Sequence, residues 1–370
     1  MKVVLAGGGT AGHINPALAI AQIIRQKRPD AEILFIGNRG AMEDTLVTRA
    51  GFSIRYIKIQ GLDRRKLYRN FQTVRLFLKA VKDSKQILRE FQPDIVVGTG
   101  GYVSGPVMYA ASKLGLHTCI HEQNAYPGVT SRMLSGRVEK VFISFEDSRA
   151  YFKKKENLVL TGNPLRAEFS DSDRDAARRA IGLSEDDFYV LSFGGSLGAE
   201  ALNRVMTDVI IRNARSQDFA QCHAMGKLGV KWMPSALEEK GATIEELPEK
   251  IQVKDYIYDM PRQVAAADIM ICRAGAITLG EITAQGKAAI LIPSPNVTHN
   301  HQYHNAMSLA KQGAAVVIEE KDLTADILYD AILSLKQDPD RLKQIRAASA
   351  AMGLPDAAET IWKNIREMLR

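Results

Sequence analysis

The stretch from Val3 to Ala21, VVLAGGGTAGHINPALAIA, decides how the chain folds. In it an apolar run leads into Gly7-x-Gly9-x-x-Gly12, the spacing of the glycine turn that joins a strand to a helix in dinucleotide-binding domains. His13 follows the last glycine, at the point where the helix should begin. The motif predicts a parallel α/β domain. It leaves open whether the turn holds a dinucleotide or another phosphate beside a working imidazole.

Length and composition are those of a soluble protein with two domains. The chain has 370 residues, 46% of them hydrophobic and 25% charged. No apolar run reaches the ~18 residues that a membrane span needs, and no signal core precedes the first strand, so we expect a cytoplasmic protein. The formal charge of +7 favours an anionic partner: nucleic acid, acidic lipid or a phosphorylated substrate. We expect Cys119, Cys222 and Cys272 to be buried thiols.

Short β-branched runs alternate with amphipathic segments, which predicts parallel sheets covered by helices on both faces. Strands are expected at residues 2–6, 32–37, 54–59, 94–99, 118–122, 140–144, 158–162, 189–194, 251–253, 268–273, 288–293 and 314–319. Helices are expected between them, for example at Pro16 to Lys27 and Ala199 to Asn213.

The glycine turn is part of an internal repeat: LSFGGSLGAEALNRV at residues 191–205 has the same pattern of strand, glycine turn and helix. This repeat predicts two similar doubly wound domains, at residues 1–164 and 165–354. The last helix, 355–370, would pack back on the first domain.

The first turn lacks the partners that dinucleotide or P-loop chemistry requires. The second predicted strand ends in Asn38-Arg39 instead of the acidic residue that binds a ribose, and neither turn continues into Gly-Lys-Ser/Thr. What remains is a turn of backbone amides at a helix N-terminus, suited to an anion or a sugar. His13 would lie at the carboxyl edge of the sheet, where open α/β folds bind ligands.

Polar residues follow two more strands of the first half. GTGGYVSGP, at residues 98–106, brings Tyr102 and Ser104 to the same edge. CIHEQNAYPG places His121, Glu122, Gln123 and Asn124 at the end of the next strand, a cluster that suits a hydroxyl-rich substrate or proton transfer. A polar loop that caps the following helix explains this cluster equally well.

The second half repeats this pattern. Gly194-Gly195-Ser196 offers amides and a hydroxyl to a phosphate, and Glu281 in ICRAGAITLGE could accept both hydroxyls of a ribose. THNHQYHNA places polar groups at the start of a helix. Its three histidines lack a carboxylate or cysteine at ligand spacing, so the pattern favours sugar contacts over zinc.

One predicted helix, RRKLYRNFQTVRLFLKAVKDSKQIL, carries an apolar stripe that we expect to be core: Leu67, Phe71, Val74, Phe77, Leu78, Val81 and Leu88. Tyr68 and Leu76 lie off this stripe, among Arg69, Arg75 and Lys79. Taken alone, this basic side is better explained by solvation than by a membrane surface.

In combination the motifs resemble the MurG family of bacterial transferases, in order and over essentially the whole chain. The motifs are GGGTAGHINPALA, GTGGYVSGP, HEQNAYPG, LTGNPLR, FGGSLGA, CRAGAITLGE and HNHQYHNA. The resemblance implies the GT-B fold, with two Rossmann-like domains facing across a cleft. It also implies inverting transfer of N-acetylglucosamine (GlcNAc) from UDP-GlcNAc to the muramyl 4-hydroxyl of undecaprenyl-pyrophosphoryl-MurNAc-pentapeptide (lipid I), which makes lipid II in peptidoglycan synthesis. No metal or other cofactor is implied.

The resemblance also implies a role for individual residues. The general base is His13 or, as second choice, Glu122, and the acceptor side includes Tyr102 and Ser104. The residues implied to bind UDP-GlcNAc are Thr10, Ala11, Gly12, Asn124, Arg166, Ser196, Ile257, Ala276, Ile277, Thr278, Leu279, Gly280, Glu281 and Gln302. Two departures from the family pattern, Ala11 and Leu197, leave the fine phosphate contacts open.

A lipid-linked acceptor implies a peripheral enzyme on the cytoplasmic face of the cell membrane, with other wall-synthesis proteins as further partners and no nucleic acid. In that light the basic side with Arg69, Arg75, Leu76 and Lys79 becomes the membrane surface. Three alternatives stay open: a GT-B transferase with another lipid acceptor such as diacylglycerol, a UDP-GlcNAc epimerase, and a non-catalytic nucleotide-sugar binding module. The sequence leaves open the general base, the oligomeric state, the protein partners, the closure of the cleft and the stem peptide accepted.

Overall fold

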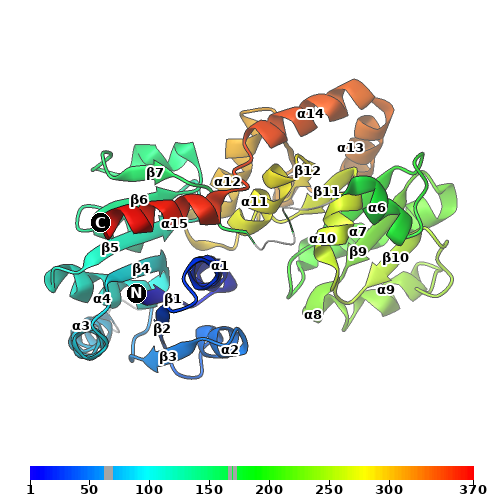
Figure 1. Cartoon of the computed structure of the whole chain (residues 1–370). Coiled ribbons are helices and arrows are strands. Elements are labelled where there is room, and N and C mark those ends of the chain that lie inside the picture. The colour runs from blue at the N-terminus through cyan, green and yellow to red at the C-terminus, as the bar shows by residue number, and fades with distance from the viewer. Residues whose placement is uncertain (62–69, 166–168, 170–172) are drawn as a thin grey trace. The chain divides into compact units, whose positions relative to one another are not determined.

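The computed structural model describes residues 1–61, 70–165, 169 and 173–370, which form two compact units (Figure 1). Unit 1 comprises Met1–Leu165 and Leu354–Arg370, and unit 2 comprises Arg166–Gly353. The residues named above that lie outside the described ones are Leu67, Tyr68, Arg69 and Arg166, together with the side chain of Phe71.

The described part of unit 1 is built on a seven-stranded parallel sheet in the order β3-β2-β1-β4-β5-β6-β7. The direction of winding reverses between β1 and β4, so the loops that follow these two strands are neighbours at the carboxyl edge. The strands are β1 Lys2–Gly7, β2 Glu32–Gly37, β3 Ser53–Tyr56, β4 Ile95–Gly100, β5 His117–Glu122, β6 Lys140–Ile143 and β7 Leu158–Leu160.

Helices cover both faces of this sheet because successive strand residues point to opposite sides. In β1, Val4 and Ala6 pack in the same core as the buried residues of α3 and α4, whereas Val3 and Leu5 pack with those of α1 and α15. The helices are α1 Ala11–Lys27, α2 Met42–Arg49, α3 Asn70–Phe91, α4 Gly101–Lys113, α5 Val129–Leu134, the 3-10 helix η2 Glu146–Tyr151, and α15 Ala357–Met368.

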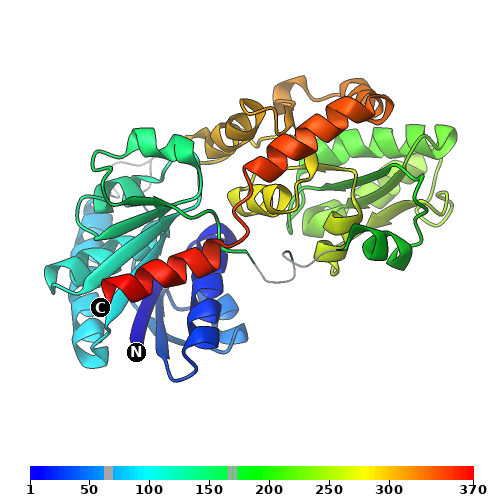
Figure 2. The same ribbon diagram turned by 45° about the horizontal axis from the view of Figure 1, so that its top comes forward.

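Helix α15 is part of unit 1, although unit 2 separates it from the rest of that unit along the chain. Ile361, Trp362 and Ile365 are buried in one core with Ile20 and Ile24 of α1. In Figure 2 this helix, drawn in red, runs back along the blue-to-green unit that contains the N-terminus. The first core of the chain is therefore completed by its last helix.

Unit 2 repeats the architecture on a six-stranded parallel sheet, in the order β10-β9-β8-β11-β12-β13 within its described residues. Here the winding reverses between β8 and β11. The strands are β8 Tyr189–Phe193, β9 Ala220–Ala224, β10 Ile251–Lys254, β11 Ile269–Cys272, β12 Ala288–Leu291 and β13 Val316–Val317. The helices are α6 Arg174–Ala180, α7 Glu200–Ser216, α8 Gly226–Gly229, α9 Met233–Glu239, α10 Met260–Ala266, α11 Ala276–Ala284, η4 Thr298–Asn300, α12 His301–Ala310, η5 Glu320–Asp322, α13 Ala325–Gln337 and α14 Pro339–Ala351.

The predicted doubly wound α/β class is confirmed, and the three cysteines are buried and free as expected. One strand was not predicted. β9 reads AQCHA, and each of its two long polar side chains has a partner inside the unit. Asn213 Nδ2 of α7 lies 2.8 Å from Gln221 Oε1, and Ser192 Oγ of β8 lies 2.9 Å from His223 Nδ1. α1 also begins at Ala11, five residues before the predicted Pro16.

The apolar stripe predicted for α3 was right only in part. Phe77, Val81 and Leu88 pack in the core as expected. Val74 and Leu78 are 54% and 63% exposed, and Leu76, which lies off the stripe, is half-buried. The reason is that α3 packs against α4, and Ala80 and Ser84 on its buried side are fully buried. The prediction used only the large apolar residues of the helix and therefore missed these two small buried residues. None of the described helices is long and apolar enough to cross a membrane.

Candidate active site

His13 lies at the carboxyl edge of unit 1, in the first turn of α1 and directly after the glycine turn. Its Nδ1 atom is 3.3 Å from the carbonyl oxygen of Gly8 and 3.1 Å from Thr10 Oγ1. A carbonyl oxygen can only accept a hydrogen bond, so Nδ1 carries the proton and the lone pair of the neutral imidazole is on Nε2. The turn thus favours the tautomer in which Nε2 carries the lone pair.

The glycines where β4 ends and α4 begins make room for this arrangement. Gly100 has φ +101°, and a Cβ atom there would lie 2.8 Å from His13 Cδ2. A Cβ atom at Gly101 would lie 2.1 Å from the Gly8 carbonyl oxygen. Thr99 Oγ1 also donates a hydrogen bond to the His13 carbonyl oxygen at 2.7 Å. The motif GTGGYVSGP therefore holds the first glycine turn in place, in addition to lying at the same carboxyl edge of the sheet.

Tyr102 and Ser104 have different environments. Tyr102 is half-buried, and its ring would lie 2.7 Å from a Cβ atom placed on Gly9. Ser104 is 1% exposed, with its hydroxyl 2.5 Å from the position of a Cβ atom on Gly98. Ser104 therefore serves the packing of α4 on β4, whereas Tyr102 lies beside the glycine turn.

Glu43, in the first turn of α2, was not singled out from the sequence. Its carboxylate is 1% exposed and accepts hydrogen bonds from two backbone amides, Gly9 N–H through Oε2 and Asn38 N–H through Oε1, both at 3.1 Å. The signal in the sequence is weak, because an acidic residue in the first turn of a helix is ordinary. Only the fold brings this residue to a turn that lies 34 positions earlier.

Two polar residues of the HEQN segment are internal and do not form part of an open rim. His121 is fully buried, and its Nε2 lies 2.9 Å from the carbonyl oxygen of Gly162. Burial lowers the pKa of His121 to about 4. Gln123 is 3% exposed and donates to the carbonyl oxygen of Thr99 at 2.9 Å. These residues tie the end of β5 to the ends of β4 and β7, and Asn124 is the half-buried member of the segment.

Both carboxylate oxygens of Glu122 are used within its own loop. Oε1 accepts hydrogen bonds from the backbone N–H of Asn124 at 3.0 Å and from Asn124 Nδ2 at 3.1 Å. Oε2 accepts one from the backbone N–H of Gly128 at 3.0 Å, and the side chain is 3% exposed. In this arrangement Glu122 shapes the loop between β5 and α5.

In unit 2, the loops after β8, β9 and β10 are joined by backbone hydrogen bonds. Lys227 N–H donates to the Ser196 carbonyl oxygen at 3.1 Å, and Gly226 N–H to that of Asp255 at 3.0 Å. Ser196 is exposed in the glycine turn before α7. The side chain of Ile257 is 2% exposed, so a ligand at this loop would meet its backbone.

The N-terminus of α11 follows β11, the strand next to β8 at the reversal of winding. Amides of the first helical turn and the turn at Gly194 are therefore neighbours, as a diphosphate site requires. Ala276 and Leu279 are buried, and Ile277, Thr278, Gly280 and Glu281 are half-buried. Gln302, at the start of α12, accepts a hydrogen bond from Ser294 N–H at 2.9 Å. Among the described residues, no group of three or more His, Cys, Asp or Glu is placed to hold a metal ion.

Two family models cover most of the chain. The Glycosyltransferase family 28 N-terminal domain matches residues 3–143, and the Glycosyltransferase family 28 C-terminal domain matches residues 189–361. The chain belongs to glycosyltransferase family 28. The two glycine turns, at the reversal points of the two sheets, are thus features of a family 28 enzyme, and the predicted GT-B fold class is confirmed.

Named relatives agree with this family. The UDP-N-acetylglucosamine--N-acetylmuramyl-(pentapeptide) pyrophosphoryl-undecaprenol N-acetylglucosamine transferase of Acetivibrio thermocellus is 43% identical, over 100% of this chain and 99% of that protein. The transferase of the same name from Alkaliphilus oremlandii is 42% identical over 100% and 99%. Among solved structures, MurG of Acinetobacter baumannii is similar with a TM-score of 0.79 at 27% identity, covering 99% of each chain. A UDP-GlcNAc 2-epimerase of Neisseria meningitidis, with a TM-score of 0.67 at 14% identity over 99% and 100%, shares the fold.

Proposed function

We propose that this family 28 enzyme transfers GlcNAc from UDP-GlcNAc to the muramyl 4-hydroxyl of undecaprenyl-pyrophosphoryl-MurNAc-pentapeptide. Its full-length relatives are named for transfer between these two substrates. The observation that carries the mechanism is the imidazole of His13, held by Gly8 in the tautomer with a basic Nε2 at the reversal point of unit 1.

The reaction is one displacement that inverts the anomeric carbon. Nε2 of His13 takes the proton of the acceptor hydroxyl while that oxygen forms a bond to C1 of GlcNAc. The bond between C1 and the diphosphate oxygen breaks, and UDP leaves with the electron pair. We assign the base to His13 because both oxygens of Glu122 already accept hydrogen bonds from their own loop.

Unit 2 is the proposed donor side, where negative charge grows on the leaving diphosphate. Ser196 and the α11 residues Ala276, Ile277, Thr278, Leu279, Gly280 and Glu281 would surround the diphosphate and ribose, with Ile257 at the uracil and Gln302 at the GlcNAc hydroxyls. The N-termini of α7 and α11 stabilise this charge with backbone amides. Thr10, Ala11, Gly12, Asn124 and Arg166 complete the proposed donor contacts.

Unit 1 is the proposed acceptor side. Tyr102 remains in this proposal, and Ser104 leaves it because its hydroxyl is buried.

The acceptor carries a long lipid, so we place the enzyme peripherally on the cytoplasmic face of an anionic membrane. The proposed contact is the α3 face, defined as Val74, Arg75, Leu78, Lys79 and Lys82. It combines two exposed apolar side chains with three exposed cations on one helix, the composition that suits an anionic bilayer surface. Leu76 leaves the proposal because it is half-buried, and Val74 and Leu78, which are exposed, replace it.

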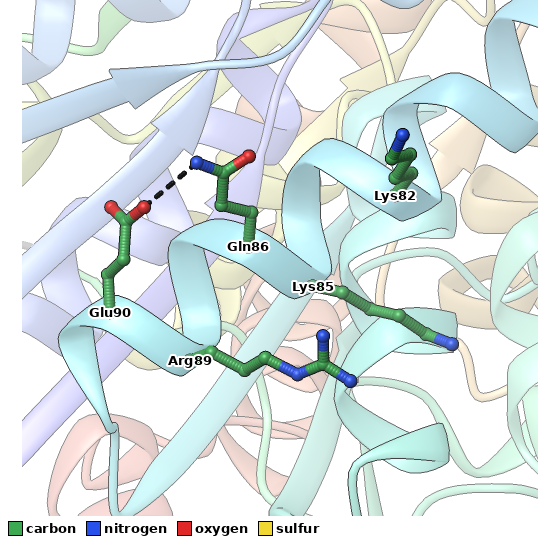
Figure 3. A pocket seen from close by; sticks show the side chains of 5 residues that line it. All are labelled: Lys82, Lys85, Gln86, Arg89 and Glu90. Carbon is green, nitrogen blue, oxygen red and sulfur yellow. Dashed lines mark hydrogen bonds between the residues drawn. The ribbon is translucent and has the colours of Figure 1, made fainter.

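The basic surface continues toward the end of the same helix. A hollow of about 380 Å³ is lined by Lys82, Lys85, Gln86, Arg89 and Glu90. Figure 3 shows Lys85 and Arg89 extending to one side, while Gln86 donates to Glu90 at 3.0 Å on the other. Cations on three successive turns suit phosphate headgroups along the helix.

The function is tested by transfer of labelled GlcNAc from UDP-GlcNAc to a lipid I analogue. We expect His13→Asn to lower kcat about 10²- to 10⁴-fold while KM for UDP-GlcNAc stays near the wild-type value, because only proton transfer is removed. Glu122→Gln keeps an oxygen for the loop and should cost less than His13→Asn. His117→Asn, a change to an exposed histidine that pairs with Glu139 at 3.0 Å, is the control.

Each contrary outcome points to a specific alternative. Transfer to diacylglycerol but not to the lipid I analogue would indicate another lipid acceptor. Conversion of UDP-GlcNAc without any acceptor would indicate an epimerase. UDP-GlcNAc binding without turnover in the wild type would indicate a binding module.

A further inference from the structure

The peptide between Gly8 and Gly9, in the first glycine turn, forms a hydrogen bond through its N–H and another through its carbonyl oxygen. The N–H of Gly9 donates to Glu43 Oε2 at 3.1 Å, and the carbonyl oxygen of Gly8 accepts from His13 Nδ1 at 3.3 Å. These two groups belong to the same planar amide, since the carbonyl of one residue and the N–H of the next share one peptide bond. A buried carboxylate and the imidazole are thus linked through a single peptide.

We propose that Glu43 is a positioning residue for the transfer reaction, acting on His13 through the Gly8–Gly9 peptide. The inference rests on the proposed function, in which His13 accepts the proton of the acceptor hydroxyl. Glu43 does not touch either substrate in this proposal. Its carboxylate polarises the amide, which makes the Gly8 carbonyl oxygen a stronger acceptor for the Nδ1 proton. That bond keeps the lone pair on Nε2 and stabilises the imidazolium that forms during the reaction.

The surroundings hold this peptide in one position. A Cβ atom on Gly8 would lie 2.7 Å from Glu43 Oε1, and one on Gly101 would lie 2.1 Å from the Gly8 carbonyl oxygen. Glycine at both positions lets the carboxylate and the β4 loop approach the peptide from two sides. The second oxygen of Glu43 is fixed by the amide of Asn38, so the carboxylate itself cannot turn away without losing a bond.

Burial of Glu43 strengthens its electrostatic coupling to His13 through the Gly8–Gly9 peptide. Glu43 is 1% exposed, so its charge is weakly screened by water. Another titratable side chain beside this turn is Tyr102 of α4, whose ring would lie 2.7 Å from a Cβ atom on Gly9. The carboxylate of Glu122, at the end of β5, is engaged elsewhere, because it accepts hydrogen bonds from Asn124 and Gly128.

The same contact explains why a dinucleotide-like turn occurs in unit 1 without the sequence signals of a dinucleotide site. In such a site the amides of the turn face a phosphate. Here the Gly9 amide faces the carboxylate of Glu43, an anion that the chain itself supplies. The turn is therefore used to orient an imidazole.

The test compares Glu43→Gln with Asp44→Asn in the full-length enzyme. Glu43→Gln removes the charge but keeps the size of the side chain. Asp44 is the matched control because it is the next residue of α2 and its carboxylate also accepts a hydrogen bond from a backbone amide, Gly40 N–H at 2.7 Å. Its other oxygen accepts one from the Tyr56 hydroxyl at 2.8 Å. The NMR titration of His13 is followed with ¹³C-labelled histidine, and its signal is assigned by its absence in His13→Asn.

We expect Glu43→Gln to lower the titration midpoint of His13 by about 0.5 or more, because an anion that favours the imidazolium is gone. kcat should fall about tenfold or more, and the acidic limb of its pH profile should move to lower pH, with KM for UDP-GlcNAc nearly unchanged. Asp44→Asn should leave all three at wild-type values. Glu43→Asp, which keeps the charge but withdraws it by one methylene, should lie between wild type and Glu43→Gln.

An unchanged His13 midpoint in Glu43→Gln would overturn the inference, as would equal effects of Glu43→Gln and Asp44→Asn. If Glu43→Gln does not fold, Glu43→Asp decides: a wild-type midpoint together with wild-type kcat contradicts the coupling. Failure of the proposed function has a different signature. In that case His13→Asn keeps wild-type kcat, while the NMR comparison still measures the link between Glu43 and His13.

Discussion

At the scale of single residues, the interior of each sheet holds a histidine in its neutral form. His223 of β9 is fully buried, and burial lowers its pKa to about 3. His121 of β5 is the counterpart in unit 1. In the unfolded chain an imidazole titrates near pH 6.5. Between pH 6.5 and 3 the unfolded state therefore binds a proton that folded His223 excludes, and stability is lost as the pH falls through this range.

Replacing His223 should flatten this dependence. Between pH 7 and pH 4.5 we expect the wild type to lose about 3 kcal/mol more unfolding free energy in unit 2 than His223→Asn. The measurement is urea unfolding in a Trp362→Phe background, where Trp232 reports on unit 2, because the chain has two tryptophans. His301→Asn, at a partly exposed position in the same unit, is the control and should keep the wild-type loss. If the unfolding free energy of unit 2 fell by the same amount in wild type and in His223→Asn between pH 7 and pH 4.5, the expectation would be contradicted.

Single residues also show how far sequence reasoning reaches. His13 could be predicted because a local motif fixes both the turn and the start of the helix. Glu43 could not, because its role arises only when β1 and β2 pair in parallel and bring α2 to the turn. For His121 and Gln123 the sequence left a substrate site and a polar loop open, because polarity alone does not show whether a side chain points inward. Their partners, Gly162 and Thr99, come from distant segments.

At the scale of elements, α3 contains both a correct and a wrong prediction. The helix was expected from its apolar period, but small residues decide which side packs. β9 was missed for a related reason: its polar side chains find their partners on α7 and β8 only when unit 2 is folded. Strands with continuous apolar runs, such as β1 and β11, were predicted without difficulty.

The α3 face gives the prediction at this scale. Arg75→Glu with Lys79→Glu should weaken binding to anionic vesicles at least about tenfold, because each cation near such a surface contributes about 1 kcal/mol. Val74→Ser with Leu78→Ser should weaken binding to anionic and neutral vesicles alike, since in the proposed contact these side chains enter the bilayer surface. Co-sedimentation with vesicles of phosphatidylglycerol and phosphatidylcholine measures both.

The control for the α3 face is Lys311→Glu with Lys343→Glu, which makes the same change in net charge at exposed positions of unit 2. If this control weakens binding as much as Arg75→Glu with Lys79→Glu, the attraction comes from net charge and the α3 face is not the contact. Binding that is unaffected by either α3 pair would contradict the placement as well.

At the scale of the whole molecule, α15 makes the stability of unit 1 depend on residues that follow unit 2 in the chain. Ile365 is fully buried in the core shared with α1. We expect Ile365→Ala to lower the unfolding free energy of unit 1 by about 3 kcal/mol through the lost contacts and the cavity. In a Trp232→Phe background, the midpoint of the urea transition followed by Trp362 fluorescence should shift to a lower urea concentration. In a Trp362→Phe background, the midpoint followed by Trp232 fluorescence should not change.

The matched control is Ile327→Ala, an isoleucine on α13 of unit 2 that is 46% exposed. It should change the unfolding of either unit by no more than about 0.5 kcal/mol. A shift of the Trp232 transition by Ile365→Ala would show that the two cores do not unfold separately.

The return of α15 also sets an order of events during synthesis. Unit 2 is a continuous segment, so all of its sheet is available once residue 353 has left the ribosome. The strands of unit 1 emerge earlier, yet the side of α1 that carries Ile20 and Ile24 stays uncovered until α15 arrives. The first domain to be translated is thus the last to be finished. During that interval these apolar side chains of α1 are uncovered, and transiently exposed apolar surface of this kind is prone to aggregation.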